Sequence, residues 1–273
     1  MLTLSVEKKQ QIRHYIYTHG RLLERKMFSF FFENGNKSEV INALVAYQNN
    51  DGGFGNGIEP DLLCPDSSAI GAETALYLID ILELSKSQIV QDITNWIINN
   101  QNEQGYIKHP PEHLKAYPHQ PWWENPDDFR ILALAGFLKK LGVKNSLFYN
   151  RVEKYYNELI LPEKFQIYDY PYFFYVKYVK NNGTDKKLFS RMIGMVSEVI
   201  NEKQDHYPLF SRYWYHAIDH FDEGLLEKEA DFFIDSIQET GTVKNPFPNL
   251  PWWNPIFTLD GLIILKKYEL LRW

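Results

Sequence analysis

A glycine-rich stretch in the first quarter of the chain gathers acidic side chains. Asp51, Glu59, Asp61 and Asp66 all lie within residues 51–66. An irregular segment with several carboxylates is a common setting for general acid–base chemistry or for cation binding. The proline between Glu59 and Asp61 stiffens the backbone, and a carboxyl group that burial keeps protonated acts as a general acid. The sequence therefore predicts Glu59 and Asp61 as catalytic carboxylates. The alternative is that both only accept hydrogen bonds from nearby donors.

The outer two carboxylates of this stretch favour structural roles. Asp51 opens a glycine-rich turn, and Asp66 directly precedes Ser67 and Ser68. Short acidic side chains accept hydrogen bonds from backbone N–H groups in turns and at helix N-termini. We expect Asp51 to cap a turn and Asp66 to cap the helix that follows.

A second stretch, residues 109–128, combines histidines, tryptophans and acids. The adjacent Trp122 and Trp123 present large ring faces, which stabilise a carbocation or pack on a sugar ring. The Pro-Trp-Trp triplet recurs at Trp252 and Trp253, and a repeated motif favours an architectural role in which the rings seal one end of a helical assembly. Both interpretations stay open. On the first, the substrate-binding residues are Phe54, His119, Trp122, Trp123, Trp252 and Trp253.

Other acids and histidines fit simpler explanations. Asp127 and Asp128 follow Pro126 and suit the first turn of a helix, where the helix dipole favours negative charge. His216 and His220, four residues apart, would share one face of an α-helix, a geometry able to hold zinc. The residue after the first histidine is alanine, where metalloproteases have glutamate. We favour a surface or core histidine pair, and we expect no metal and no cofactor.

Nucleophilic and phosphate-binding chemistry have little support. Cys64, the only cysteine, lies among acidic neighbours that raise the pKa of a thiol. The sequence contains no Gly-x-Ser-x-Gly elbow, no phosphate-binding Gly-x-x-x-x-Gly-Lys loop and no dinucleotide fingerprint. Acidic residues follow the glycines at positions 52–57, which favours cations or neutral ligands over anions.

Composition describes an acidic globular chain that is rich in aromatic residues. The 273 residues include 18 Phe, 18 Tyr and 7 Trp, together 16%, and the formal charge is −6. This charge argues against nucleic acid as a partner. The aromatic residues fit either a core of large rings or an aromatic-lined pocket.

No targeting or membrane-spanning segment is evident. The start, Met1–Gln11, turns polar early, and the longest apolar run, Ile131–Leu138, is far shorter than a membrane span. We expect a cytoplasmic protein without a transmembrane segment, and a peripheral membrane contact stays open.

Apolar residues at helical spacing predict successive helices that position these side chains. Capping-box patterns at residues 36–39 and 85–88 mark two helix starts. The segment 165–179 is ambiguous, because its Tyr and Phe residues favour a strand while its neighbours favour helices. Further helices are expected at about 5–18, 22–33, 69–83, 127–141, 146–160, 185–202, 212–220, 225–240 and 257–271.

Two short patterns repeat along the chain. Gln48 and Gln101 each end a predicted helix, with glycine four residues on and an aromatic residue just beyond; Gln238 begins a fainter copy. Glutamine can bond loose carbonyls there, glycine can take the left-handed turn, and the ring can pack back on the neighbouring helices. Together with the two Pro-Trp-Trp triplets, this indicates matched halves within one domain over 1–273.

These motifs resemble those of a known superfamily. The helix followed by Gln48-Asn49-Asn50-Asp51-Gly52-Gly53-Phe54-Gly55 is similar to the repeat of squalene–hopene cyclases and protein prenyltransferase β subunits. The continuation to Asp61 and the later Pro-Trp-Trp resemble a smaller bacterial prenyltransferase-like group. The similarity covers about residues 38–130 and implies an all-α, α/α-toroid fold with a central cavity. The family's Asp-x-Asp-Asp motif does not occur in this chain.

Three functions follow as hypotheses. The resemblance implies a terpenoid cyclase-like or prenyltransferase-like protein that binds an apolar isoprenoid in an aromatic cavity, with chemistry started by an acid. The second is a carbohydrate-active toroid, a glycoside hydrolase or lyase, in which tryptophans stack on sugars and two carboxylates act as acid and base. The third is a ligand-binding toroid without catalysis. Polar groups dispersed among the rings would favour a sugar, and an unbroken apolar wall would favour an isoprenoid.

Overall fold

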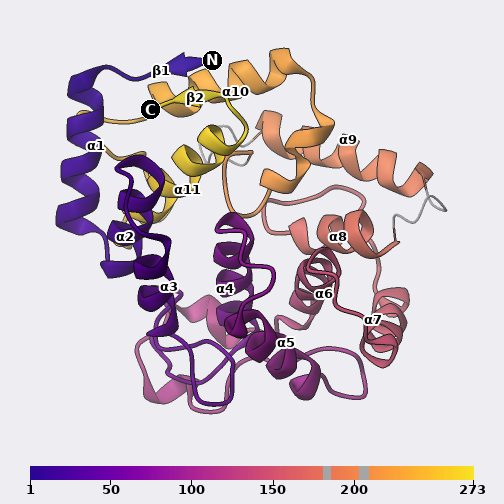
Figure 1. Ribbon diagram of the computed structural model, residues 1–273. Coiled ribbons are helices and arrows are strands. Elements are labelled where there is room, and N and C mark those ends of the chain that lie inside the picture. The colour runs from indigo at the N-terminus through magenta and orange to yellow at the C-terminus, as the bar shows by residue number, and fades with distance from the viewer. Residues whose placement is uncertain (181–185, 203–208) are drawn as a thin grey trace. The chain divides into compact units, whose positions relative to one another are not determined.

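Helices form most of the protein in the computed structural model, which describes residues 1–180, 186–202 and 209–273 (Figure 1). Within these residues the strands are β1 (Leu2–Thr3) and β2 (Leu271–Arg272), which pair in parallel. The prediction of an all-α fold is therefore confirmed. The chain forms two compact units, each drawn from separated stretches of sequence.

Unit 1 consists of residues 1–43, 165–167 and 193–273. Phe28 and Phe32 of α2 pack against Trp273 near the C-terminus, with ring centroids 5.5 and 4.5 Å away. Gly261 lets α11 approach the Phe233 ring of α10, because a Cβ there would come within 2.1 Å of that ring. The helices of this unit are α1 (Val6–His19), α2 (Leu22–Phe32), α10 (Glu223–Asp235) and α11 (Trp253–Lys267), with a 3-10 helix, η6 (Tyr215–His220), and parts of α3 (Lys37–Val45) and α9 (Lys186–Glu202).

Unit 2 consists of residues 44–164 and 168–192. In its core, Phe137 of α6 packs against Phe174 of α8, with ring centroids 4.8 Å apart. Nearly every residue of α4 is buried, so this helix is central to the unit. Its helices are α4 (Ala69–Ile81), α5 (Gln88–Asn100), α6 (Ile131–Lys140), α7 (Ser146–Glu158), α8 (Tyr170–Tyr175) and the π-helix η4 (Val176–Lys180), with 3-10 helices η1 (Leu114–Ala116), η2 (Pro121–Glu124) and η3 (Asp128–Arg130).

The Gln–Gly–aromatic repeat builds two similar turns. Gln48 donates its side-chain N–H to the carbonyl of Gly52 at 3.1 Å, and Gln101 donates to that of Gly105 at 3.0 Å. Both glycines have a positive φ, 88° and 101°. Tyr106 then packs on Tyr155 of α7, with centroids 5.3 Å apart. The predicted glutamine bonds and left-handed glycines are confirmed, and they make the repeat a structural device.

Several predicted boundaries are wrong. The helix expected from 127 begins at Ile131, because 128–130 form a 3-10 turn first. The ambiguous segment 165–179 contains helix rather than strand. The helix expected at 257–271 begins at Trp253, and its last expected residue lies in β2. In the patterns at 36–39 and 85–88, Asn36 does bond the Ser38 N–H, but α5 begins after Ser87 rather than Ser85. Residue 185 lies outside the described residues.

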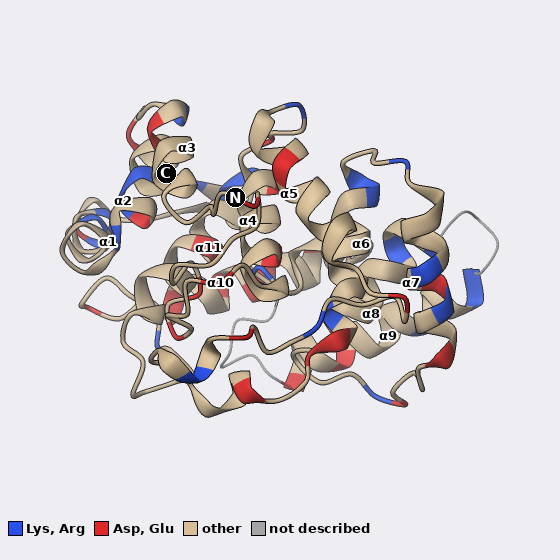
Figure 2. Cartoon of the chain, turned by 90° about the horizontal axis from the view of Figure 1, so that it is seen from below, with Lys and Arg blue, Asp and Glu red and all other residues tan. Residues whose placement is uncertain are grey.

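Charged side chains of both signs are interspersed on the helices (Figure 2). On α7, for example, Arg151 and Lys154 alternate with Glu153 and Glu158. Among the described residues, no helix has the length and apolar character that crossing a membrane requires.

Candidate functional site

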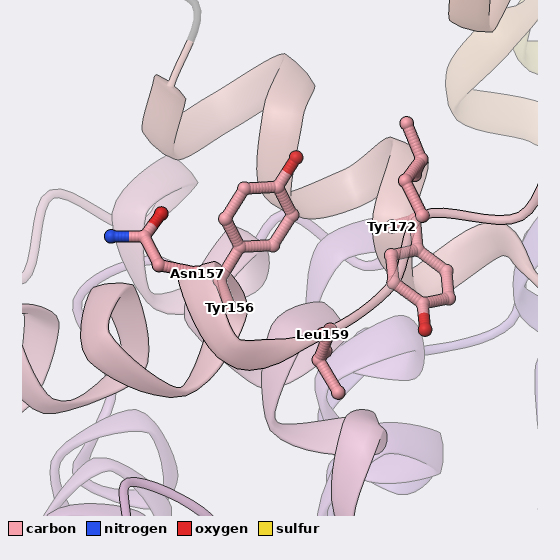
Figure 3. Close-up of a pocket in the computed structure, with 5 residues that line it drawn as sticks. Tyr156, Asn157, Leu159 and Tyr172 are labelled. Atoms are coloured by element: carbon pink, nitrogen blue, oxygen red, sulfur yellow. The ribbon is translucent and has the colours of Figure 1, made fainter.

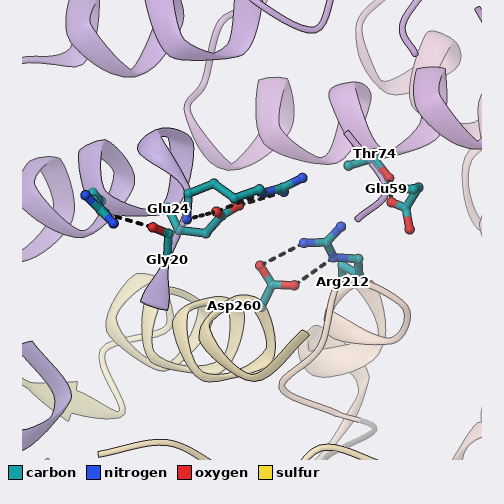
Figure 4. Close-up of polar contacts among 8 residues, drawn as sticks. Gly20, Glu24, Glu59, Thr74, Arg212 and Asp260 are labelled. Carbon is teal, nitrogen blue, oxygen red and sulfur yellow. Dashed lines mark hydrogen bonds and ion pairs between the residues drawn. The ribbon is translucent and has the colours of Figure 1, made fainter. Parts of the chain in front are cut away.

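The two predicted catalytic carboxylates are both buried in unit 2. Glu59 accepts a hydrogen bond from the Thr74 hydroxyl of α4 (Figure 4). Asp61 accepts one from the indole N–H of Trp123, at 3.1 Å from Nε1 to Oδ1. The backbone N–H of Gln120 also donates to the Asp61 carbonyl at 3.0 Å. Asp61 is therefore positioned by the stretch 109–128, which the sequence had singled out separately.

Asp51 and Asp66 support the loop. Asp51 accepts from the Gly53 N–H at 2.9 Å, from the Ser67 hydroxyl and from the indole of Trp96, which confirms its role in a turn. Asp66 accepts from the backbone N–H of His113 at 3.0 Å. The prediction that Asp66 caps α4 is wrong, because the hydroxyl of Ser68 accepts the Gly71 N–H there.

His109 bonds the backbone of Trp123. Its Nε2 lies 2.9 Å from the Trp123 carbonyl oxygen. Since a carbonyl only accepts, Nε2 carries the proton. Burial lowers the pKa of His109, and the nearby negative charge of Asp127 opposes this only in part. His109 is therefore a neutral imidazole at neutral pH.

A buried ion-pair network lies close to His109, and its centre is Arg130. The guanidinium bonds Glu73 of α4 and Asp127, and it donates to the Tyr170 hydroxyl of α8 at 2.9 Å. The Tyr170 hydroxyl in turn donates to Glu73. Burial raises the pKa of the Glu73 carboxyl, although the Arg130 charge opposes that rise. A carboxyl whose pKa is raised in this way is suited to hold and release a proton.

Glu59 is bonded to Thr74, and Arg130 is bonded to Glu73. Thr74 and Glu73 are adjacent residues of α4, so both bonds are made to the same helix. We call these groups the polar cluster. Its members come from two α-helices, two 3-10 helices and two loops of unit 2, and all of its ionisable members except Arg130 are more than nine-tenths buried. The polar cluster comprises Glu59, Asp61, Glu73, Thr74, His109, Trp123, Asp127, Arg130 and Tyr170.

The sequence analysis missed Glu73, Arg130 and Tyr170. The available signal was Glu73 itself, a single acid in the otherwise apolar or neutral stretch Ala69–Leu78. A buried carboxylate in such a helix needs a cationic or hydrogen-bonding partner. That partner, Arg130, lies 57 residues further along the chain.

Asp127 and Asp128 behave differently although they are neighbours. Asp127 is buried and pairs with Arg130, whereas Asp128 is half-buried. Burial and the charge of Asp127 raise the pKa of Asp128. Two adjacent carboxyls with different environments are a common arrangement for an acid and a base.

Aromatic side chains lie at the exposed margin of the polar cluster. Trp122, the predicted stacking residue, is 41% exposed. Tyr168 is 44% exposed, and the partial burial of its ring together with the charge of Asp61 raises its pKa to about 12. The His119 side chain is mostly buried, its Nε2 lies 3.3 Å from Oε1 of Glu124, and its backbone forms a bridge with Leu62. Of the predicted site residues in unit 2, Trp122 is therefore the exposed one.

Phe54 lies elsewhere in unit 2. It is fully buried, and its carbonyl accepts the Ser68 N–H at 3.0 Å. Phe54 therefore packs in the core beneath the loop rather than on an exposed surface.

The second tryptophan pair belongs to unit 1. Trp252 is exposed, and Trp253, the first residue of α11, is buried. The Arg212 guanidinium lies 5.7 Å from the Trp253 ring centroid and pairs with Asp260, with 2.7 Å between Nε and Oδ2 (Figure 4). Within the described residues, the indole nitrogen of Trp253 has no hydrogen-bond partner.

The histidine pair does not form the predicted helical face. His216 and His220 lie in the 3-10 helix η6, where side chains repeat every three residues, so four-residue spacing separates them around the axis. His216 is buried and His220 is exposed. Among the described residues, no group of three or more His, Cys, Asp or Glu side chains is arranged to hold a metal ion. Burial raises the pKa of the Cys64 thiol, as does the charge of Asp66.

A cavity of about 220 Å³ opens in unit 2 (Figure 3). It is lined by Tyr156 and Asn157 of α7, by Leu159 and Leu161 just after that helix, and by Tyr172 of α8. None of the predicted site residues lines this cavity. Tyr172 nevertheless shares α8 with Tyr170 of the polar cluster.

No protein-family model, no curated protein and no solved structure matches the chain. Its function is therefore inferred from the chemistry of the site.

Proposed function

We propose that this chain is a carbohydrate-active enzyme, in which carboxyl groups of the polar cluster act as general acid and base. The observation that carries the proposal is the mixture of rings and polar groups around Glu59 and Asp61. Thr74 and Trp123 donate to these two carboxylates. Sugars are bound by such dispersed hydrogen-bonding groups together with ring faces.

The carboxyl groups provide the acid–base chemistry. Cleavage of a glycosidic bond uses a pair of Asp or Glu residues, one that protonates the leaving oxygen and one that acts as base or nucleophile. Glu59 and Asp61 are the proposed pair. Glu73, which pairs with Arg130 and accepts from Tyr170, directly precedes Thr74 on α4. The ion-paired network therefore supports the helix from which Thr74 donates to Glu59.

The exposed aromatic residues provide the sugar platform. Trp122 presents a large ring surface in the same 3-10 helix as Trp123, which donates to Asp61. A ring that is fixed by its neighbours and open on one side binds the apolar face of a sugar at low entropic cost. The proposed scaffold is an α/α toroid of one domain over 1–273, as the resemblance implies.

An apolar isoprenoid is the competing substrate. An uninterrupted wall of apolar groups would favour binding of an isoprenoid. The hydroxyl and indole donors around Glu59 and Asp61 favour a sugar instead. The cyclase-like or prenyltransferase-like function is therefore the alternative outcome of the test.

A ligand-stabilisation experiment on the full chain separates the two substrates. Thermal unfolding is measured with mono- and oligosaccharides and with isoprenoid diphosphates and neutral polyprenes. A ligand at 100 times its dissociation constant raises the free energy of unfolding by about 2.7 kcal/mol. The proposal predicts stabilisation by a saccharide. Stabilisation by an isoprenoid alone would contradict it.

Two variants test the assigned carboxyls. Glu59→Gln and Asp61→Asn keep the shape of each side chain and remove its acid–base function. We expect both to bind the stabilising saccharide and to lose its turnover. Glu112→Gln, at an exposed position of the stretch 109–128, is the matched control and keeps full activity.

A further inference from the structure

The cavity of unit 2 is built from fixed aromatic walls. Tyr156 packs on Tyr175 with ring centroids 4.7 Å apart, and Tyr172 stacks on Phe129 at 6.0 Å with an interplanar angle of 15°. Figure 3 shows Tyr156 and Tyr172 on either side of Leu159. Rings held by neighbouring rings lose little conformational entropy when a ligand binds, so the cavity is preorganised.

The lining selects a neutral ligand of mixed polarity. It offers two phenol groups, one carboxamide and two leucine side chains, and none of these five side chains is charged. Burial and the charge of Asp169 raise the pKa of Tyr172, so its hydroxyl remains a hydrogen-bond donor at neutral pH. The tyrosine and asparagine groups both donate and accept, which matches the hydroxyl groups of a sugar.

The volume selects a ligand of one ring. Pockets for drug-sized molecules span about 300–1,000 Å³. The cavity of about 220 Å³ is smaller. A single sugar ring is in this size range.

The cavity is connected to the polar cluster through two elements. Tyr172 and Tyr170 lie on the same helix, and Phe129, which stacks on Tyr172, directly precedes Arg130. Tyr172, which lines the cavity, thus follows by two residues the Tyr170 whose hydroxyl donates to Glu73.

We infer that this cavity is a binding subsite for one neutral monosaccharide ring, with Tyr172 and Asn157 as the residues that recognise its hydroxyl groups. The inference rests on the proposed function, since it assigns a sugar-binding subsite to the unit that holds the proposed catalytic carboxyls. The ring lies against the aromatic walls, and the carboxamide of Asn157 and the phenols bond its hydroxyls.

The test is direct binding of neutral monosaccharides to the full chain. Glucose, galactose, mannose and xylose are titrated and followed by ligand-observed NMR, with choline as a cationic comparison. We expect Asn157→Ala and Tyr172→Phe each to weaken binding by about two- to tenfold, the effect of one lost hydrogen bond. Leu161→Trp, which fills the cavity without removing a polar group, should abolish binding. Asn150→Ala, an exposed asparagine on the same helix, is the control and should bind like the wild type.

The outcomes separate this inference from the proposed function. If Asn157→Ala, Tyr172→Phe and Leu161→Trp all bind monosaccharide like the wild type and still turn over saccharide, the subsite is overturned and the enzyme function is left intact. Monosaccharide binding that depends on Asn157 and Tyr172, with full turnover by Glu59→Gln and Asp61→Asn, would support the subsite and contradict the catalytic assignment. Preference for choline, or no binding of any of the four sugars, would overturn the subsite.

Discussion

The indole N–H of Trp123 donates to the carboxylate of Asp61 at 3.1 Å, although 62 residues separate them in the sequence. This bond turns a tryptophan that could stack on substrate into a group that orients a carboxylate. Its neighbour Trp122 keeps an exposed ring. The two tryptophans of one motif thus have different roles in the proposed site.

Removal of the Arg130 side-chain charge should destabilise unit 2 strongly. Arg130→Met leaves two buried carboxylates, Glu73 and Asp127, without their cation. Loss of one partner from a buried ion pair costs about 3–5 kcal/mol in the free energy of unfolding. Urea unfolding of the variant measures this.

The matched control for Arg130 is an exposed ion pair. Lys26→Gln breaks the bond to Glu39, whose side chain is about half exposed. Such pairs contribute about 0–1 kcal/mol. Equal losses in the two variants would contradict the role of Arg130 as the centre of a buried network.

The repeat turns should tolerate no side chain at the glycine. Gly105 has a φ of 101°, and a Cβ there would come within 2.2 Å of the Arg151 carbonyl oxygen. Gly142 has a φ of 79°, and a Cβ there would meet nothing within 4 Å. Gly142→Ala therefore reports backbone strain alone, about 1–2 kcal/mol, and Gly105→Ala adds a steric clash. Thermal unfolding of both variants should show the larger loss for Gly105→Ala.

Gly105→Ala and Gly142→Ala together also test whether the repeat has a packing role. If both alanine variants lose the same stability, the close approach of α7 to Gly105 contributes nothing. The repeat would then be a local turn without a packing role.

The free energy of unfolding should fall on acidification, because the buried His109 is neutral in the folded protein. Its pKa is lowered by burial in the folded state, so the unfolded chain takes up a proton more readily below its usual pKa of about 6.5. The stabilisation is present above that pH and is lost as the pH falls toward the lower folded-state pKa. His109→Gln lacks this group, so the stability difference between wild type and variant should shrink between pH 7 and pH 5.

Exposed His14→Gln is the control for this measurement. Unfolding curves at several pH values for the three proteins give the comparison. A difference between wild type and His109→Gln that grows on acidification would contradict a neutral, buried imidazole.

Asp128 should show the opposite pH dependence. Its pKa is raised by burial and by Asp127, so the folded state binds the proton more tightly than the unfolded chain does. This stabilisation is present below the unfolded pKa of about 3.9 and is lost as the pH rises through the folded-state value. Asp128→Asn should therefore gain stability relative to the wild type between pH 3 and pH 7. A relative loss over that range would show that Asp128 is stabilised as an anion.

Local sequence patterns predicted much of the fold because their causes are local. The glutamine bonds, left-handed glycines and most helices follow from residues a few positions apart. The bond between Glu73 and Tyr170 spans 97 residues and has no local pattern, so the ion-pair network was not predicted. The face expected for His216 and His220 failed because their segment is a 3-10 helix, a choice that four-residue spacing does not reveal.

The same distinction applies to the candidate site. The stretches 51–66 and 109–128 were each recognisable by composition, and Glu59 and Asp61 were assigned from residue type and a neighbouring proline. The pairing of the two stretches, through Leu62 with His119 and Trp123 with Asp61, depends on tertiary structure.

The most direct test of the proposed enzyme is the rate at which the wild type, Glu59→Gln and Asp61→Asn cleave the saccharide that stabilises the protein. General acid–base catalysis by one side chain contributes about 10²–10⁴-fold. We predict a loss in this range for both variants, with folding and saccharide binding retained. Cleavage at the wild-type rate by both variants, or stabilisation of the protein by an isoprenoid alone, would contradict the proposed function.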